Sequence, residues 1–229
     1  MRNLVIFGTS TTAESIYEFV VYHKLFNVIG FTVDNKEINE FKGLPVYNLS
    51  ELEVKSTFNK NEDFLFVAIQ WNYLNKVRRN VYKRLKSEGY KFANIISPNT
   101  LIYGEIKGDN CWISDFVIIE HSSIIGSNIY IKTKAYVAHG CIIENHCFIG
   151  ANSFIAGLVK IGEQSFVGIS SNIFDDLVIG KKCLIGACTI VKRNMPNFSS
   201  IKTNSENYIV KNYTEDEIES KLISSKNVR

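Results

Sequence analysis

The chain of 229 residues has the composition of an ordinary globular protein, with 45% hydrophobic and 21% charged residues. Its formal net charge is only +3, and the lysines form no basic face, which argues against nucleic-acid binding. The first apolar run, Leu4 to Phe7, is far too short for a signal peptide or a membrane span. Five cysteines without CxxC spacing indicate reduced core residues and a cytoplasmic protein.

The first 94 residues alternate between strand and helix patterns. Apolar runs over 4–7, 28–33 and 64–69 predict strands, and helical patterns start near residue 13 and extend over 72–88. This alternation predicts a parallel sheet with right-handed crossovers, and hence a small Rossmann-like α/β domain over residues 1–94. The second long helix is expected to turn its basic side chains to solvent: Arg78, Arg79, Lys83, Arg84 and Lys86.

The turn after the first strand, Gly8 to Ala13, keeps one glycine of a G-x-G-x-x-G pattern, and a plain strand–helix turn with threonine caps explains it equally well. Asp34, at the tip of the second strand, stands where the acidic residue of a nucleotide fold contacts a ribose or base. Gln70 and Trp71 follow the third strong strand at the same edge. They are expected to wall the same crevice, although Trp71 also suits a packed interface.

From residue 113 to residue 191, every sixth position is isoleucine or valine. Neither a helix nor a simple strand has this period; it is typical of hexapeptide repeats, in which three hexads close one triangular coil of 18 residues. The fold predicted for residues 95–201 is therefore a left-handed parallel β-helix. Residues 202–229 are expected to form a polar tail, with a short helical piece after Thr214.

Residues 18 positions apart lie above one another in such a coil. His121 and His139 therefore share a column, which continues with Gly157 and Asp175. A histidine at such a turn is usually a solvated surface residue, but the glycine above His139 leaves room around its imidazole, which can accept a proton near neutral pH. No Ser–His–Asp or Cys–His arrangement and no metal-ligand spacing stands out, so neither covalent catalysis nor a metal is expected.

The two halves together resemble a known family. The segments FGTSTTA, FTVDN, GLPV, FVAIQWN and ISPNTLIYG, followed by VAHGC within the hexads, are similar to the NeuD/PglD-type sugar acyltransferases over residues 1 to about 195. This family includes sialic-acid O-acetyltransferases, bacillosamine-type N-acetyltransferases and the viosamine and perosamine N-acetyltransferases. The resemblance implies a homotrimer with acetyl-CoA in the groove between neighbouring β-helices, and a nucleotide-linked sugar on the N-terminal domain.

The resemblance also implies roles for single residues. The general base of the V-x-H-x-C motif falls on His139. The family's substrate-binding positions fall on the first turn and on the tip of the second strand: Thr9, Ser10, Thr11, Asp34 and Asn35. Gly8 in the same turn and Gln70 at the neighbouring strand end are expected to join them because of their places in the predicted α/β domain. Acetyl-CoA contacts fall on later coils: Gly157, Ile169 and Ala187.

Two positions depart from the family pattern. Many members have an acidic residue directly after the base, where this chain has Gly140, and a second histidine that contacts the acetyl group, where it has Phe148. Glu120, in the previous coil, is expected to supply the missing carboxylate. Asn152 or Ser153 would then donate a hydrogen bond to the thioester oxygen, so that Phe148 and Asn152 complete the acetyl-CoA site.

The sequence thus predicts direct acetyl transfer from acetyl-CoA to a nucleotide-linked amino sugar, a 4-amino-4,6-dideoxyhexose, for O-antigen, another surface polysaccharide or a glycan. An amine needs only a modest base, which favours N-acetylation over O-acetylation. Two alternatives stay open, an O-acetyltransferase of sialic acid or a related sugar and a non-catalytic trimeric binding module. The nucleotide (dTDP, UDP or GDP), the sugar and the role of His121 are left open.

Overall fold

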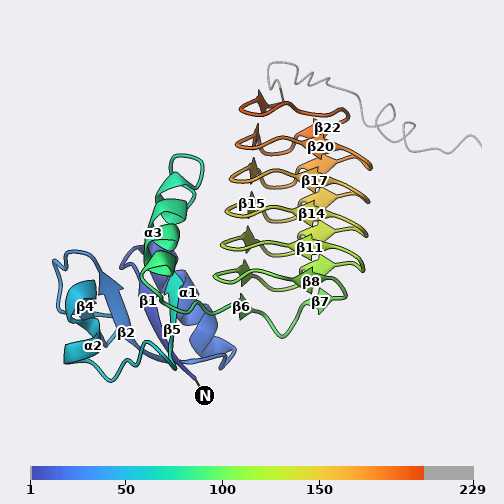
Figure 1. Cartoon of the computed structure of the whole chain (residues 1–229). Helices are drawn as coiled ribbons and strands as arrows, with labels where there is room; N and C mark the ends of the chain where they lie inside the picture. The colour runs from blue at the N-terminus through green and yellow to red at the C-terminus, as the bar shows by residue number, and fades with distance from the viewer. Residues whose placement is uncertain (1, 204–229) are drawn as a thin grey trace, which may run out of the picture.

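The computed structural model describes residues 2–203, which form an α/β unit followed by a β-helix (Figure 1). The α/β unit has a five-stranded sheet in the order β3-β4-β2-β1-β5. All neighbours pair in parallel except β3 and β4. The strands are β1 (Asn3–Phe7), β2 (Asn27–Val33), β3 (Glu40–Phe41), β4 (Leu44–Asn48) and β5 (Phe64–Val67). The expected fold class of the first unit is therefore confirmed.

Helices cover both faces of this sheet. They are α1 (Thr11–Tyr22), α2 (Leu52–Lys55) with the 3-10 turn η1 (Leu49–Glu51) before it, and α3 (Lys76–Ser87). One core contains the apolar stripe of α1 (Ala13, Ile16 and Val20) with Leu4 and Ile6 of β1. The other side chains of β1 pack with α3 in a second core. The alternation of side chains along β1 thus accounts for both layers.

Helix α3 differs from the prediction in two ways. It begins at Lys76 because Tyr73, Leu74 and Asn75 all have left-handed backbone angles, which a helix does not allow. Arg78, expected in solvent, is fully buried against the β-helix. The expectation of a solvent-facing Arg78 was wrong because a charge pattern along one helix does not reveal a neighbouring domain.

The β-helix consists of two-residue strands that stack into three flat faces (Figure 1). We call the seven-stranded face the docking face, the six-stranded one the second face and the five-stranded one the third face. The docking face contains β6 (Ile95–Ile96), β9 (Trp112–Ile113), β12 (Tyr130–Ile131), β15 (Phe148–Ile149), β18 (Phe166–Val167), β21 (Leu184–Ile185) and β23 (Ser200–Ile201). The second face contains β7 (Leu101–Ile102), β10 (Ile118–Ile119), β13 (Tyr136–Val137), β16 (Phe154–Ile155), β19 (Asn172–Ile173) and β22 (Ile190–Val191). The third face contains β8 (Glu105–Ile106), β11 (Ile124–Ile125), β14 (Ile142–Ile143), β17 (Lys160–Ile161) and β20 (Val178–Ile179).

The register follows the 18-residue map: Ile118 pairs with Tyr136, Tyr130 with Phe148, and Ile142 with Lys160. The aliphatic residue of each hexad is the second residue of its strand and points into the core, and Cys141, Cys147 and Cys183 fill small slots there as free thiols. The left-handed β-helix predicted from the repeat is therefore confirmed.

Each corner of the coil contains one residue in the left-handed backbone region. From Asn110 to Cys188 these residues recur every six positions, and only one of them, Gly140, is a glycine. The others have φ between 53° and 64°, a conformation that costs each side chain some energy and that the hydrogen-bonded stack enforces. Side chains at the corners therefore point outward, away from the packed core.

The ends of the β-helix depart from the repeat. In the first coil, Ile95 pairs with Trp112 at a spacing of 17 residues, and in the last, Leu184 pairs with Ser200 at a spacing of 16. The coil thus continues beyond Val191, where the six-residue pattern stops, up to Ile201. Of the expected tail, residues 204–229, including the predicted helical piece after Thr214, lie outside the described residues.

The α/β unit packs against the docking face through α3 and the end of β5 (Figure 1). The Tyr130 hydroxyl donates to the carbonyl of Val67 at 2.7 Å, and the amide of Val67 donates to Asn110 at 2.8 Å. Arg78 stacks on the ring of Tyr130 at 3.9 Å and donates to the carbonyls of Asn128 and Cys147. These buried polar contacts fix the position of the α/β unit on the β-helix.

Candidate active site

His139 lies at the corner between the second and third faces, one residue before the left-handed Gly140. Its side chain is half exposed, and its ring is stacked on that of His121 with centroids 5.8 Å apart. The other side of the imidazole lies against Gly157, where an added Cβ would come within 2.5 Å of Cε1. The predicted column of His121, His139 and Gly157 is thus a real stack, and the ring occupies the room that the glycine leaves.

Glu120 lies directly beside this histidine. Its carboxylate accepts the backbone N–H of His139 at 2.8 Å and stands 3.5 Å from Nδ1 of the ring. Hydrogen bonds from the hydroxyl of Tyr136 and from the His139 backbone hold the pKa of Glu120 below its usual range. An ionised carboxylate at Nδ1 favours the proton on that nitrogen, which leaves the lone pair on Nε2.

The residues expected to contact acetyl-CoA lie in three places. Gly157 is in the His139 corner, whereas Asn152, Ile169 and Ala187 lie on the corner between the docking and second faces. Phe148 faces the α/β unit instead, with its ring 5.1 Å from Trp71 and 4.9 Å from Phe166. The amide of Asn152 donates to the hydroxyl of Ser170 on the next coil at 3.2 Å, and the hydroxyl of Ser153 donates to the carbonyl of Gly168.

The residues expected to bind the substrate gather at the carboxyl ends of the parallel strands. Gly8, Thr9, Ser10, Thr11 and Gln70 line one crevice there. Thr9 and Asn35 also line an adjoining hollow with Val33, Glu37, Ile38 and Val46. Asp34 is engaged elsewhere, because both of its oxygens accept from Arg84, at 2.7 and 2.8 Å.

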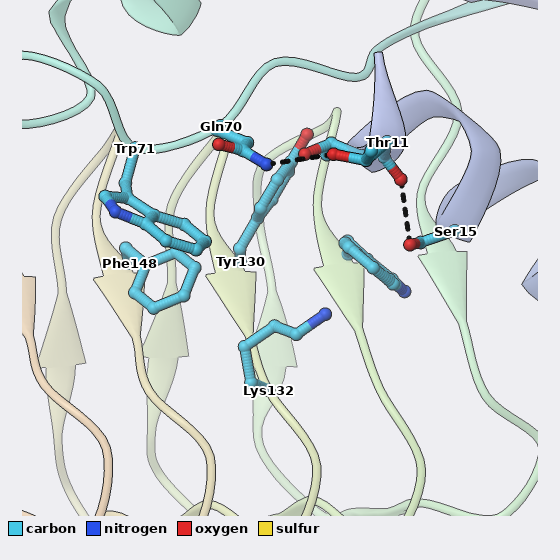
Figure 2. Close-up of a pocket in the computed structure, with 9 residues that line it drawn as sticks. Thr11, Ser15, Gln70, Trp71, Tyr130, Lys132 and Phe148 are labelled. Carbon is cyan, nitrogen blue, oxygen red and sulfur yellow. Dashed lines mark hydrogen bonds between the residues drawn. The ribbon is translucent and has the colours of Figure 1, made fainter.

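A further pocket lies where the α/β unit meets the docking face, and sequence reasoning missed most of its lining (Figure 2). The α/β unit contributes Thr11, Thr12, Ser15, Gln70 and Trp71, and the β-helix contributes Trp112, Tyr130, Lys132 and Phe148. The amide of Gln70 donates to the hydroxyl of Thr11 at 3.3 Å across its mouth. The 18-residue column of Trp112, Tyr130, Phe148 and Phe166 was the available signal, because four successive aromatic side chains on one face indicate a covered surface.

The two halves of the predicted site lie apart within one chain. The pocket borders the docking face and shares Thr11 and Gln70 with the crevice, whereas His139 stands on the corner at the far edge of the second face. The six-stranded second face separates them, and its outward side chains, including Phe154 and Ile190, are exposed or half exposed. Within residues 2–203, no helix is long and apolar enough to cross a membrane. Over the same residues, no three His, Cys, Asp or Glu side chains are grouped to hold a metal ion.

Comparisons with known proteins find a family match within each unit. Residues 3–85 match the PglD N-terminal domain family, and residues 124–157 match the bacterial transferase hexapeptide family (six repeats). These matches confirm the resemblance derived from the sequence. No curated protein sequence matches significantly.

Several solved structures share the fold. A mutant of perosamine N-acetyltransferase from Caulobacter crescentus, in complex with CoA and GDP-perosamine, is 24% identical with a TM-score of 0.76, covering 87% of this chain and 93% of that one. The acetyltransferase domain of PglB from Neisseria gonorrhoeae, in complex with acetyl coenzyme A, is 18% identical with a TM-score of 0.74, covering 87% and 95%. WeeI from Acinetobacter baumannii is 18% identical with a TM-score of 0.75, covering 90% and 98%.

Proposed function

Because the chain joins a PglD N-terminal domain to a hexapeptide-repeat transferase domain, the pairing expected of NeuD/PglD-type sugar acyltransferases, we propose that it is an acetyl-CoA-dependent N-acetyltransferase of a nucleotide-linked amino sugar. The sugar is a 4-amino-4,6-dideoxyhexose, used for O-antigen, another surface polysaccharide or a glycan. The observation that carries the proposal is His139, held beside Glu120 and over Gly157 on a β-helix corner. The complexes of structural neighbours with CoA, acetyl-CoA and GDP-perosamine support it.

In the proposed reaction, His139 removes a proton from the sugar amine as the amine attacks the thioester carbonyl of acetyl-CoA. Nε2 takes the proton, because Glu120 favours protonation of Nδ1, and the carboxylate then stabilises the imidazolium that forms. The new C–N bond gives a tetrahedral oxyanion; its collapse breaks the C–S bond, and the leaving CoA thiolate takes back the proton from Nε2. Of the two expected oxyanion donors, Ser153 is buried and already donates to the carbonyl of Gly168, and Asn152 lies on the other corner of the second face, so Asn152 would act only from a neighbouring subunit. Much of the rate gain comes from holding the two substrates in line.

N-acetylation fits this base better than O-acetylation. The position after His139 is Gly140, so the imidazole has the single carboxylate of Glu120 for support, and its side chain is half exposed. Such a base suffices for a neutral amine, which is already a good nucleophile. A hydroxyl would require a more strongly activated imidazole.

We further propose that the working form is a homotrimer. A half-exposed base on a β-helix corner needs a second surface to close the site, and large apolar side chains are exposed on and beside that corner: Ile142, Phe154, Leu158, Phe174 and Ile190. In a trimer, these side chains would lie between subunits, and His139 would approach the crevice of a neighbour. Sedimentation should give three times the chain mass, and Phe154→Asp should lower it. A monomeric wild-type protein would contradict this proposal.

A panel of substrates tests the proposed activity. The purified protein is mixed with acetyl-CoA and dTDP-, UDP- or GDP-linked amino sugars, with sialic acid as the hydroxyl acceptor, and thiol release is followed. We expect turnover with at least one 4-amino sugar and none with sialic acid. Turnover with sialic acid and with no amino sugar would refute N-acetylation and indicate an O-acetyltransferase. Failure to bind acetyl-CoA would instead indicate a non-catalytic binding module.

A further inference from the structure

The pocket between the α/β unit and the docking face contains an unexpected cation. Lys132 follows strand β12 and extends from the β-helix toward the α/β unit, into a cavity of about 200 Å³ (Figure 2). Its Nζ lies 3.1 Å from the centre of the Trp112 ring. Aromatic rings of Trp71, Tyr130 and Phe148 form much of the remaining wall. The ammonium group is thus withdrawn from water into an aromatic enclosure.

No carboxylate lines this pocket among the described residues, and Lys132 forms no ion pair there. Asp115, one coil earlier on the same corner, is already engaged, because it pairs with His23 at 3.1 Å and accepts from Asn99 at 3.2 Å. Glu14, in the first turn of α1, pairs with Lys42 at 2.9 Å. The cation therefore lacks the counter-charge that a withdrawn ammonium normally has.

The pocket is continuous with the crevice proposed for the nucleotide. Thr11 and Gln70 line both, and the crevice continues through Ser10 and Thr9 toward Asn35. Helix α1 begins at this junction, and the side chain of its N-cap, Ser10, makes no capping bond to the first-turn N–H groups. The positive end of a 12-residue helix and the Lys132 ammonium thus border one cavity from opposite domains.

We propose that Lys132 binds an anionic oxygen of the substrate inside this pocket, and is the residue by which the β-helix recognises the ligand held by the α/β unit. This inference rests on the proposed function, in which the phosphate next to the sugar would be that oxygen. A carboxylate on the sugar would present the same kind of anionic oxygen and is the second possible source of it. In either case Lys132 determines substrate affinity and does not take part in acetyl transfer.

Binding of the bare anion is the direct test, because it does not depend on turnover. Titration calorimetry measures the affinity for UDP, GDP and dTDP, for the corresponding nucleosides, and for sialic acid against its methyl ester. Lys132→Met removes the charge and keeps an apolar chain, Lys132→Arg keeps the charge, and Lys134→Met is the exposed control two residues along the same corner. Thermal melting of each variant verifies folding.

We expect Lys132→Met to weaken binding of the best nucleoside diphosphate by roughly tenfold to a hundredfold at pH 7, while nucleoside binding and the Lys134→Met variant stay unchanged. Lys132→Arg should restore most of the affinity. A loss confined to sialic acid, with its methyl ester unaffected, would identify a carboxylate as the source. Equal affinity of wild type and Lys132→Met for every anion, or no anion binding by the wild type, would overturn the inference.

The pH dependence of binding gives a second readout, because burial lowers the pKa of the Lys132 ammonium to about 8. As pH rises from 7 to 9.5, diphosphate affinity should fall more steeply in the wild type than in Lys132→Met and Lys132→Arg, which share only the titration of the nucleotide base. Tyr130 is the other titratable residue lining the pocket, and burial raises its pKa above this range.

Acetyl transfer by Lys132→Met with the KM of the wild type for the nucleotide sugar would refute the inference and leave the proposed function intact. Nucleotide binding that depends on Lys132, in a protein without acetyl transfer, would support the inference and refute the proposed function.

Discussion

At the scale of single residues, the position of the His139 ring depends on the missing side chain at Gly157. The backbone of Gly157 is not in the left-handed region, so an alanine there would not strain the chain. Its Cβ would instead come within 2.5 Å of Cε1 and 2.7 Å of Nε2 in the imidazole. Since the ring is half exposed, it would move toward solvent, away from Glu120.

Gly157→Ala should therefore lower kcat for acetyl transfer at least about tenfold while the thermal midpoint changes little, because catalysis is more sensitive than stability to a displaced base. Steady-state kinetics and a melting curve measure the two effects. Glu120→Gln is the companion variant, since it keeps the side-chain volume but removes the charge at Nδ1, and it should also lower kcat. Unchanged kcat in Gly157→Ala would mean that the observed ring position is not the working one.

At the scale of elements, α3 attaches the α/β unit to the β-helix through Arg78. The charge pattern of this helix predicted a solvent-facing arginine, and the repeat carried no information about what covers each face of the β-helix. Neither pattern reveals that the guanidinium inserts between two coils and covers the ring of Tyr130. The aromatic column on the docking face signals that this face is covered, but no local pattern says which helix covers it, so the contact with Arg78 did not follow from the sequence.

Arg78→Ala should destabilise the protein by about 2–4 kcal/mol, because it removes two buried hydrogen bonds to backbone carbonyls and opens a cavity beneath α3. Chemical denaturation measures the loss, and faster hydrogen exchange over α3 would locate it. Lys83→Ala, on the exposed side of the same helix, is the matched control and should change stability by less than about 0.5 kcal/mol. Equal effects of the two substitutions would refute the proposed role of Arg78.

The corner that faces α3 contains a buried polar column that should make stability sensitive to acid. The amide of Asn110 donates to Asn128, whose own amide lies 2.9 Å from Nδ1 of His146. Burial, with the nearby charges of Lys83, Arg78 and Arg79, lowers the pKa of His146 to about 3, even though the carboxylate of Glu163 stands 3.7 Å from Nε2. The unfolded chain takes up a proton near pH 6.5, whereas the folded chain resists it down to about pH 3.

The stability that neutral His146 contributes is thus complete above pH 6.5 and is lost as pH falls toward 3, at no more than about 1.4 kcal/mol per pH unit for one proton. His146→Gln should reduce the pH dependence of the thermal midpoint across this window, although it lowers the midpoint at pH 7.5. Melting curves at pH 7.5, 6, 5 and 4 measure both effects. A parallel pair of pH profiles would assign the acid sensitivity to other groups.

At the scale of the whole molecule, the two domains differ in how much of them could be read from the sequence. The six-residue period predicted the β-helix, its 18-residue register and the stacking of His139 with His121 and Gly157. It does so because the repeat assigns each residue to one coil and one column. It did not predict the pocket containing Lys132, which exists only because a second domain covers the docking face. The site residues of the α/β unit were predicted as a group, but the Asp34–Arg84 pair was not, since it joins residues 50 positions apart.

The most direct test of the account is acetyl transfer by wild type and His139→Asn under identical conditions, with acetyl-CoA and the best amino sugar of the panel. Asparagine keeps a polar side chain but cannot accept a proton at neutral pH, so kcat should fall by about 10²- to 10⁴-fold while the affinities for acetyl-CoA and the nucleotide sugar change little. Wild-type turnover in His139→Asn would contradict the account, because the base at the β-helix corner is its central claim.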